Sequence, residues 1–278
     1  MGVVRVGTCA WSDHTGFYPS GLRPADRLPY YARFFPLVEV DSTFYHPTSA
    51  RQTGLWAART PQGFRFHVKA YRVLTWHDRT AIPDPATLRE HAAAFRAAVA
   101  PLHDAGKLAA LHFQFPPWFV VGPDTRAYLE AVREALPDLP LAVEFRHRSW
   151  FAPQQTDATL ALLAALGVAH TVCDEPQVGQ GSVPTVWAVT WPRLAVVRFH
   201  GRNRTTWYRR TPTTGERFRY RYSREELAAC LEPLRELARQ ADAVHVLFNN
   251  NYQDSAVRNA AELAELLGLG YPDPWAPA

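Results

Sequence analysis

Three residues with side chains suited to acid–base or covalent chemistry stand at the ends of apolar runs. Glu144 and Asp174 each close such a run, and two carboxylates that face a cleft can move protons during hydrolysis. Lys69 closes another run, and a desolvated lysine near other cations can act as a base or as a Schiff-base nucleophile. We therefore predict Glu144, Asp174 and Lys69 as catalytic residues. Two alternatives stay open: Glu144 simply pairs with Arg146 or Arg198, and Lys69 only binds an anion or forms an ion pair.

Many arginines are interleaved with aromatic residues in one segment, residues 201–224, which reads GRNRTTWYRRTPTTGERFRYRYSR. Arginine side chains bind phosphates and aromatic rings stack on bases, so this composition is typical of a nucleic-acid contact. The segment follows the seventh apolar run, and many eight-stranded barrels bind phosphate at that place. We predict DNA, RNA or a phosphorylated small molecule as the partner. The alternative is a hairpin-like flap whose arginines stack on its own rings and pair with surface carboxylates.

Histidines that could bind a metal ion lie at different depths of the apolar runs. They are His67, His112, His200 and His245. With Glu144 and Asp174 they offer ligand types that suit zinc or manganese. However, no HxH or HExxH spacing brings two of these histidines together locally. We predict no metal and no cofactor.

Apolar or alternating runs that predict strands recur eight times along the chain. They are Val3–Cys9, Leu37–Tyr45, Phe64–Tyr71, Leu108–Phe115, Leu141–Arg146, Val168–Asp174, Leu194–His200 and Ala243–Asn249. Amphipathic stretches between them predict helices at Ala50–Arg59, Pro85–His103, Asp124–Leu136, Gln154–Leu166, Arg224–Ala241 and Ser255–Leu267. Strands alternating with helices indicate a parallel sheet, and eight strands close into a barrel. We predict one (β/α)8 TIM-barrel domain over residues 1–278, with loop insertions at about 72–83 and 202–223.

Side chains alternate between the two faces of a strand, and the continuously apolar face should meet the helices. In the third run Phe66 and Val68 then face the helices, which turns His67 and Lys69 toward the barrel axis. The same parity turns further polar residues inward: Glu39, Asp41, Thr43, Arg65, His112, Gln114, Glu144, Arg146, Arg198, His200, His245 and Asn249. Buried charges must pair or line a wet pocket, so this interior predicts more than a packed core of valine and leucine.

The polar groups at the C-terminal ends of the strands are the better candidates for a binding pocket, because barrel active sites lie there. We expect the deeper Glu39, Arg65 and His245 to be structural. We predict as substrate-binding residues Trp11, Asp41, Tyr45, Gln114, Arg146, His147, Arg198, His200, Arg202, Tyr222, Asn249 and Asn250.

The composition is that of a globular protein, with 47% hydrophobic and 20% charged residues. No apolar run approaches the roughly 20 residues that span a bilayer, and the amino-terminal sequence enters a strand pattern without a signal-peptide pattern. Cys9, Cys173 and Cys230 form no CxxC pair, and their odd number argues against a disulfide framework. These features predict a cytoplasmic protein without a membrane partner. The net charge of +4 is compatible with anionic partners.

Short motifs at the strand ends occur along nearly the whole chain in an order that resembles the YecE-like family, whose domain has no known function. The motifs are GTCAW (7–11), FYP (17–19), EVDSTFY (39–45), FRFHVK (64–69), QFPP (114–117), VEFRHRSW (143–150), RFHGR (198–202), FNN (248–250) and NA (259–260). The resemblance implies a TIM barrel with a pocket at those strand ends, and no established reaction. Two positions depart from it: Asp41 stands where asparagine is usual, and Asp254 where glycine is common.

Three functional hypotheses follow from these patterns. The first is an enzyme, hydrolase or lyase in type, acting on nucleic acid or a phosphorylated nucleotide-like substrate. The second is a metal-independent carbohydrate-active enzyme that uses Glu144 and Asp174, because tryptophans near strand ends suit sugars as well as bases. The third is a barrel that binds a ligand without turnover. The fold alone cannot choose among them, because TIM barrels host many chemistries.

Overall fold

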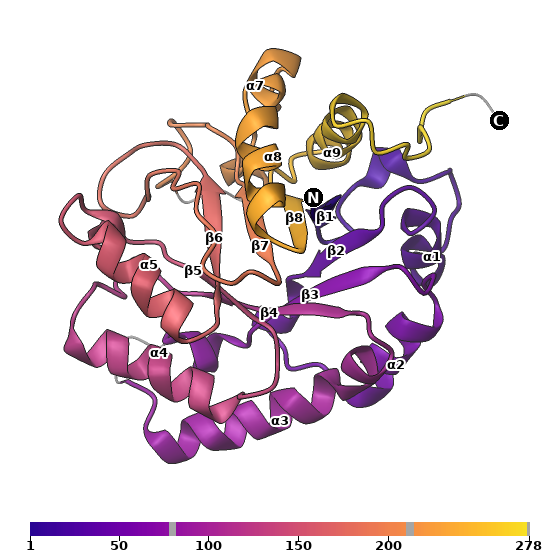
Figure 1. Ribbon diagram of the computed structural model, residues 1–278. Coiled ribbons are helices and arrows are strands. Elements are labelled where there is room, and N and C mark those ends of the chain that lie inside the picture. Colours follow the sequence, from indigo (N-terminus) through magenta and orange to yellow (C-terminus); the bar gives the residue numbers. More distant parts are fainter. Residues whose placement is uncertain (78–81, 210–213, 277–278) are drawn as a thin grey trace.

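Eight parallel strands close into a barrel in the computed structural model, which describes residues 1–77, 82–209 and 214–276 (Figure 1). Each strand pairs with the next, and the last pairs with the first. The strands are β1 (Val3–Cys9), β2 (Leu37–Val40), β3 (Arg65–Lys69), β4 (Leu108–Gln114), β5 (Leu141–Glu144), β6 (Ala169–Asp174), β7 (Ala195–Phe199) and β8 (Ala243–Phe248). The predicted (β/α)8 barrel is confirmed.

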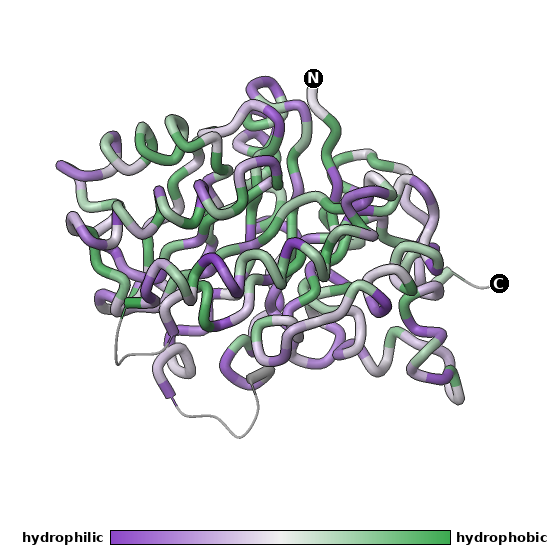
Figure 2. The backbone as a smooth tube through the Cα atoms, turned by 90° about the horizontal axis from the view of Figure 1, so that it is seen from below, coloured by the Kyte–Doolittle hydropathy of each residue, from purple (hydrophilic) through white to green (hydrophobic). Residues whose placement is uncertain are grey.

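Helices cover the outside of the strands (Figure 1). The described helices are α1 (Arg27–Tyr31), α2 (Ala50–Ala58), α3 (Pro85–Asp104), α4 (Pro123–Ala135), α5 (Thr156–Ala165), α6 (Thr214–Arg217), α7 (Arg224–Ala228), α8 (Leu231–Gln240) and α9 (Ser255–Leu266). The short α6 is not part of this outer layer but belongs to the loop after β7. Local signals start some of the helices: Asp84 caps α3 with Pro85 in its first turn, and Ser223 and Glu226 form a capping box on α7. Hydrophilic and hydrophobic residues alternate along the outer helices (Figure 2). None of the described helices is both long and apolar enough to cross a membrane.

Six strands end earlier than the sequence predicted: β4, β7 and β8 by one residue, β3 and β5 by two, and β2 by five. The run Leu37–Tyr45 leaves the sheet after Val40, because Ser42–Phe44 forms a turn of 3₁₀ helix. The run Leu141–Arg146 leaves the sheet after Glu144. In both places the hydrophobic pattern continues for a few residues beyond the last strand pairing, so the pattern alone placed the ends too late.

The predicted helix Arg224–Ala241 is also wrong as one element, because α7 and α8 are separate helices. Pro233 has no backbone N–H and is tolerated best in the first turn of a helix, and α8 begins two residues before it. Two short helices, α1 and α6, were not predicted. The two predicted loop insertions include residues 78–81 and 210–213, which lie outside the described residues.

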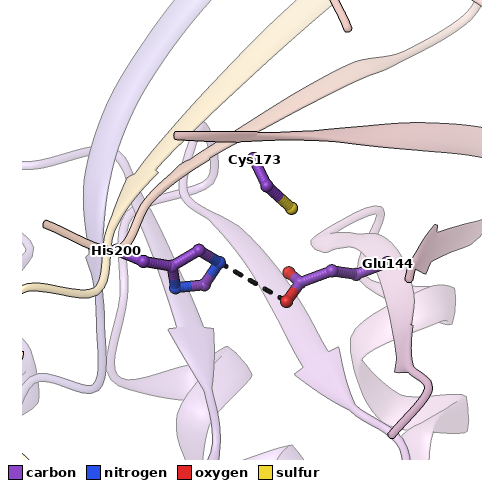
Figure 3. Close-up of side chains that lie close together, drawn as sticks. All are labelled: Glu144, Cys173 and His200. Carbon is purple, nitrogen blue, oxygen red and sulfur yellow. Dashed lines mark ion pairs between the residues drawn. The ribbon is translucent and has the colours of Figure 1, made fainter. Parts of the chain in front are cut away.

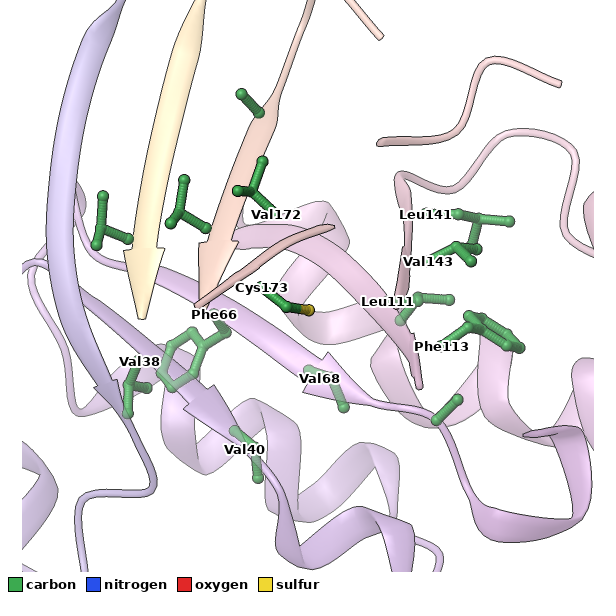
Figure 4. Close-up of a cluster of buried hydrophobic side chains, with 14 of the residues drawn as sticks. Val38, Val40, Phe66, Val68, Leu111, Phe113, Leu141, Val143, Val172 and Cys173 are labelled. Carbon is green, nitrogen blue, oxygen red and sulfur yellow. The ribbon is translucent and has the colours of Figure 1, made fainter. Parts of the chain in front are cut away.

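The strand parity predicted from the sequence agrees with the contacts. Val38, Val40, Phe66 and Val68 belong to the apolar layer between strands and helices (Figure 4). Contacts between non-neighbouring strands can form only across the barrel interior, and Glu39 of β2 reaches Arg198 of β7. In the same way His67 Nε2 of β3 lies 2.9 Å from His245 Nδ1 of β8. The inner face of the barrel is therefore polar and buried.

Small residues on the inner face make room for these long side chains. Ala110, Ala142 and Ala169 are fully buried there beside Cys9. Gly7 of β1 is the tightest position, because a Cβ atom on it would stand 1.9 Å from the backbone oxygen of Leu37. An eight-stranded barrel is just wide enough for side chains to fill, so large charged groups require small neighbours.

Candidate functional site

Glu144, the last residue of β5, is the centre of an ion network inside the barrel. Its Oε1 lies 2.6 Å from Nε of Arg146, and its Oε2 lies 2.5 Å from Nη1 of Arg198. His112 Nε2 lies 3.2 Å from Oε2, and His200 Nε2 lies 3.4 Å from Oε1. Burial raises the pKa of Glu144, but the two guanidiniums outweigh burial and hold the pKa well below its usual range. This environment makes Glu144 a fixed anion, and its catalytic role stays a prediction.

Arg198 on β7 connects two carboxylates across the barrel. Besides Glu144 it contacts Glu39, with Nη2 2.8 Å from Oε1, and the same Nη2 lies 3.3 Å from the Cys9 sulfur. Its exposed fraction is 1%. A guanidinium with a carboxylate at each end has little left to offer a substrate, so its contacts favour a structural role over the predicted substrate-binding one.

Arg146 extends the network from Glu144 to a second buried carboxylate, Glu175. It contacts Glu144 on one side, and on the other side its Nη1 lies 2.7 Å from Oε2 of Glu175. The other oxygen of Glu175 accepts a hydrogen bond from the backbone N–H of Val183. Burial raises the pKa of Glu175 to about 7 although Arg146 opposes this shift. The sequence reasoning missed Glu175, and its position directly after the strand-end Asp174 was the signal available.

A cavity of about 360 Å³ lies at the C-terminal ends of the strands. The predicted site residues that line it are Asp41, Tyr45, Lys69, Gln114, Arg146 and Asn249. They come from five different strand ends, because parallel strands deliver the residues that follow them to one rim. The other lining residues are Phe44, His77, Pro116, Pro117, Trp118, Gly181, Arg217 and Phe218.

Lys69, at the end of β3, is a cation of this cavity that lies near the carboxylates Glu39, Asp41 and Glu144 without forming an ion pair with any of them. Among the described residues its amine forms neither a hydrogen bond nor an ion pair, and it lies over the ring of Phe44, 4.8 Å from the ring centre. Burial and the positive charge of Arg198 lower the pKa of Lys69. The amine therefore loses its proton more readily than an ordinary lysine does.

Two further titratable groups face the same cavity. Burial raises the pKa of Asp41 to about 6, and the charge of Lys69 opposes this shift. Burial lowers the pKa of His77 to about 3, and Lys69 adds to that shift. The cavity thus holds an amine whose pKa is lowered, a carboxyl whose pKa is raised, and an imidazole that is neutral near neutral pH.

Aromatic rings form one wall of the cavity. Tyr45 and Trp118 are exposed, and the Trp118 indole donates a hydrogen bond to the backbone oxygen of Trp76. Arg217 lies over the rings of Trp207 and Phe218, at 5.0 and 5.7 Å from their centres. Flat rings beside a guanidinium can stack on a base or a sugar while the cation meets a phosphate.

The arginines of segment 201–224 mostly have partners within the protein. Carboxylate pairs are Arg202 with Asp174 and Glu226, Arg221 with Glu262, and Arg224 with Glu265. Arg219 lies over the ring of Tyr252. Arg204 and Arg209 make no such contact with the described residues, and Arg210 lies outside them. The segment therefore presents less unpaired charge to a nucleic acid than its composition suggests, and nucleic-acid binding stays a prediction.

Asp174, at the end of β6, faces a different cavity from Lys69. Its oxygens accept hydrogen bonds from Nε and Nη2 of Arg202, at 2.9 and 2.7 Å, and from the hydroxyl of Tyr222 at 2.6 Å. It lines a cavity of about 530 Å³, whereas Glu144 lines neither that cavity nor the 360 Å³ one. In the described part of the chain, the two carboxylates of the predicted hydrolytic pair therefore share neither of these cavities.

The remaining predicted substrate-binding residues lie outside the first cavity and hold neighbouring segments. The Asn250 amide donates to the backbone oxygen of Tyr220, and the Tyr222 hydroxyl donates to Asp174. His147 Nδ1 accepts the backbone N–H of Ser149. Trp11 packs edge-on against Trp56, and Arg202 pairs with Asp174. His200 contacts both Arg146 and Asn249.

Among the described residues one group of possible metal ligands is present, formed by Glu144, Cys173 and His200, whose ligand atoms lie within 4.8 Å of one another (Figure 3). Glu144 is already neutralised by Arg146 and Arg198, and burial raises the pKa of the Cys173 thiol well above its usual value. A cation at this point would meet two fixed guanidiniums. The donor set therefore fits a metal ion poorly.

Comparisons with known proteins agree with this architecture. The family model described as "Protein of unknown function DUF72" matches residues 5–278. The chain is 40% identical over 274 residues to the UPF0759 protein YunF of Bacillus subtilis strain 168, covering 97% of this chain and 96% of that protein.

Solved structures of the same family superpose over nearly the whole chain. A DUF72 family protein from Enterococcus faecalis V583 matches with a TM-score of 0.88 and 30% identity, over 99% of both chains. One from Thermotoga maritima MSB8 matches with a TM-score of 0.83 and 34% identity, over 96% of this chain and 99% of that one. The family of unknown function implied by the strand-end motifs is thereby confirmed at that level. The chain belongs to the DUF72 family.

Proposed function

We propose that this protein is a cytoplasmic enzyme, hydrolase or lyase in type, whose 360 Å³ cavity binds a small phosphorylated, nucleotide-like substrate. The observation that carries the proposal is the amine of Lys69, which faces the cavity and, among the described residues, makes neither a hydrogen bond nor an ion pair. A partly buried ammonium group whose donors are unused leaves a place for the anion of a ligand.

The rest of the lining supports the same ligand class. Arg217 adds a second cation, and Tyr45 and Trp118 supply flat faces for a ring. The volume lies at the lower end of the roughly 300–1,000 Å³ usual for small-molecule sites. A small ligand also fits better than a long nucleic acid, because three of the seven described arginines of segment 201–224 pair with carboxylates and two more lie over aromatic rings.

Acid–base groups suited to turnover face the same space. The Lys69 amine and the Asp41 carboxyl both have pKa values displaced toward neutrality, which is where proton transfer is most efficient. Glu144 and Asp174 share neither cavity, so the geometry gives the carbohydrate alternative no comparable support.

We expect the Lys69→Met variant to bind adenosine monophosphate roughly 10- to 100-fold more weakly than the wild type, because it loses a charge-assisted contact with the phosphate. Calorimetric titration measures both affinities. Arg209→Met is the matched control, since Arg209 is exposed and lines neither cavity. Adenosine without phosphate should bind both variants equally. If the wild type and Lys69→Met bound adenosine monophosphate with equal affinity, the proposal would be contradicted.

Anion affinity should rise as the pH falls from 8 to 6. The pKa of Glu175 is raised to about 7, so above pH 7 Arg146 faces two carboxylates and below pH 7 it faces one. Its charge is then less neutralised toward the cavity, and an interaction change of roughly 1 kcal/mol corresponds to about a fivefold gain in affinity. Titration with sulfate, whose charge is constant in this range, measures the effect. The Glu175→Gln variant should show a flatter pH dependence, and an identical profile would refute this explanation.

A further inference from the structure

Lysine is nearly absent from this protein. Of its 30 lysine and arginine residues, only Lys69 and Lys107 are lysines. Where a cation is needed, this chain otherwise uses arginine. The two lysines therefore stand at positions where the particular chemistry of an amine can matter.

Lys107 has a structural reason to be a lysine. Its amine donates hydrogen bonds to the backbone oxygens of Ala57 and Thr60, both at 2.6 Å, and contacts the Thr60 hydroxyl at 3.2 Å. A compact ammonium group can point three donors at acceptors clustered around the end of α2, whereas a planar guanidinium cannot. Lys107 lies just before β4, at the opposite end of the strand from the cavity.

Lys69 has no such set of acceptors. Its amine lies over the Phe44 ring and faces the cavity. If the role of this residue were only to attract a phosphate, arginine would serve at least as well, because its fork binds phosphate in a bidentate manner. What lysine can do and arginine cannot is to lose its proton and attack an electrophile.

We propose that the substrate of this cavity is a phosphorylated aldehyde or ketone, and that the amine of Lys69 forms an imine with its carbonyl carbon. This inference rests on the proposed function, since it concerns the same site and its phosphorylated ligand. It narrows the ligand to carbonyl compounds and the reaction to the lyase type that an imine supports.

Groups that line the cavity supply the nucleophile and a proton for this reaction. The neutral Lys69 nitrogen adds to the carbonyl carbon as the C=O π bond breaks, and the proton that the nitrogen then loses is transferred to the carbonyl oxygen to give a carbinolamine. Loss of its hydroxyl as water, with a proton from the carboxyl of Asp41, leaves a protonated C=N bond on Lys69. The surroundings of both groups fit these roles. Burial and the charge of Arg198 lower the pKa of the Lys69 amine, and burial raises the pKa of the Asp41 carboxyl. Arg217 lies on the same lining and suits the phosphate.

The experiment uses D-glyceraldehyde 3-phosphate as the probe and cyanoborohydride to reduce any imine to a stable secondary amine. Peptide mass mapping then reads the adduct at every amine of the chain, which are Lys69, Lys107 and the amino terminus. We expect the adduct at Lys69, with much slower reaction at the other two. Glyceraldehyde without phosphate should react at Lys69 roughly tenfold more slowly or less, because it lacks the charge-assisted phosphate contact. Sulfate should slow the phosphorylated probe by competition.

Two variants separate the role of the amine from the binding of the phosphate. Lys69→Arg keeps the positive charge, so we expect it to bind adenosine monophosphate and to form no adduct at residue 69. Asp41→Asn should slow adduct formation at Lys69 while that binding persists. If the wild type binds adenosine monophosphate but Lys69 reacts no faster than Lys107, the imine is refuted and the proposed binding function stands. If Lys69 reacts fast and equally with both aldehydes, the amine is confirmed as a nucleophile and the phosphorylated substrate is refuted.

Discussion

Replacing Glu144 with glutamine should lower the free energy of unfolding by roughly 3–5 kcal/mol, the range found when one partner of a buried ion pair is removed. The variant keeps the shape of the side chain and removes its charge. Arg146 and Arg198 would then both lack the carboxylate that they share inside the barrel. For a domain of this size we expect the melting temperature to fall by roughly 6–20 °C, measured by circular dichroism.

The matched control is Glu265→Gln, which removes the carboxylate partner of Arg224 at the surface. Exposed pairs contribute about 0–1 kcal/mol, so its melting temperature should stay close to that of the wild type. A catalytic Glu144 would behave differently, with an unchanged melting temperature and a turnover lowered by roughly 100-fold or more. Unchanged stability of Glu144→Gln would therefore contradict the anchoring role and favour the catalytic prediction.

The Gly7→Ala variant should fold poorly or not at all. Its methyl group would stand 1.9 Å from the backbone oxygen of Leu37, and backbone of a neighbouring strand cannot rotate away as a side chain can. Separating β1 from β2 far enough would strain the pairing of Thr8 with Val38. Overpacking inside cores typically costs about 1–3 kcal/mol, and we expect a loss beyond this range.

Soluble yield and thermal unfolding measure this effect, with Gly63→Ala as the control. A methyl group on Gly63 meets no atom within 4 Å, so that variant should differ from the wild type by no more than about 0.5–1 kcal/mol. If Gly7→Ala is as stable as Gly63→Ala, β1 and β2 do not approach as closely as described.

The periodicity of the sequence was sufficient to predict the barrel and the inner face of its strands. Alternation in β3 alone predicted that His67 faces inward and Val68 outward, since the side-chain period of a strand is two. The ends of strands are less predictable, because pairing stops where the partner strand stops. Val40 is the last residue of β2 although the following residues still suit a strand.

The candidate site could be predicted only in part. The rim residues Lys69, Gln114 and Asn249 were found because each stands at or just after a strand end. Which charges neutralise one another could not be found, because Glu144 and Arg198 are 54 positions apart and meet only after the barrel closes. The partners of the arginines in segment 201–224 come from equally distant parts of the chain, and composition alone does not reveal them.

The polar interior of the barrel also affects how the stability of the protein changes with temperature. The hydration of charged groups becomes less favourable as the temperature rises, so the penalty for keeping Arg198 and Glu144 away from water shrinks on warming. Contacts between apolar side chains show no comparable gain, because the hydrophobic effect per unit of buried area reaches a plateau. Compared with the hydrophobic stabilisation, the desolvation penalty of the interior ion pairs is therefore smaller in hot solution than in cold. Replacing the pairs with packed leucine and methionine would help the barrel most at low temperature.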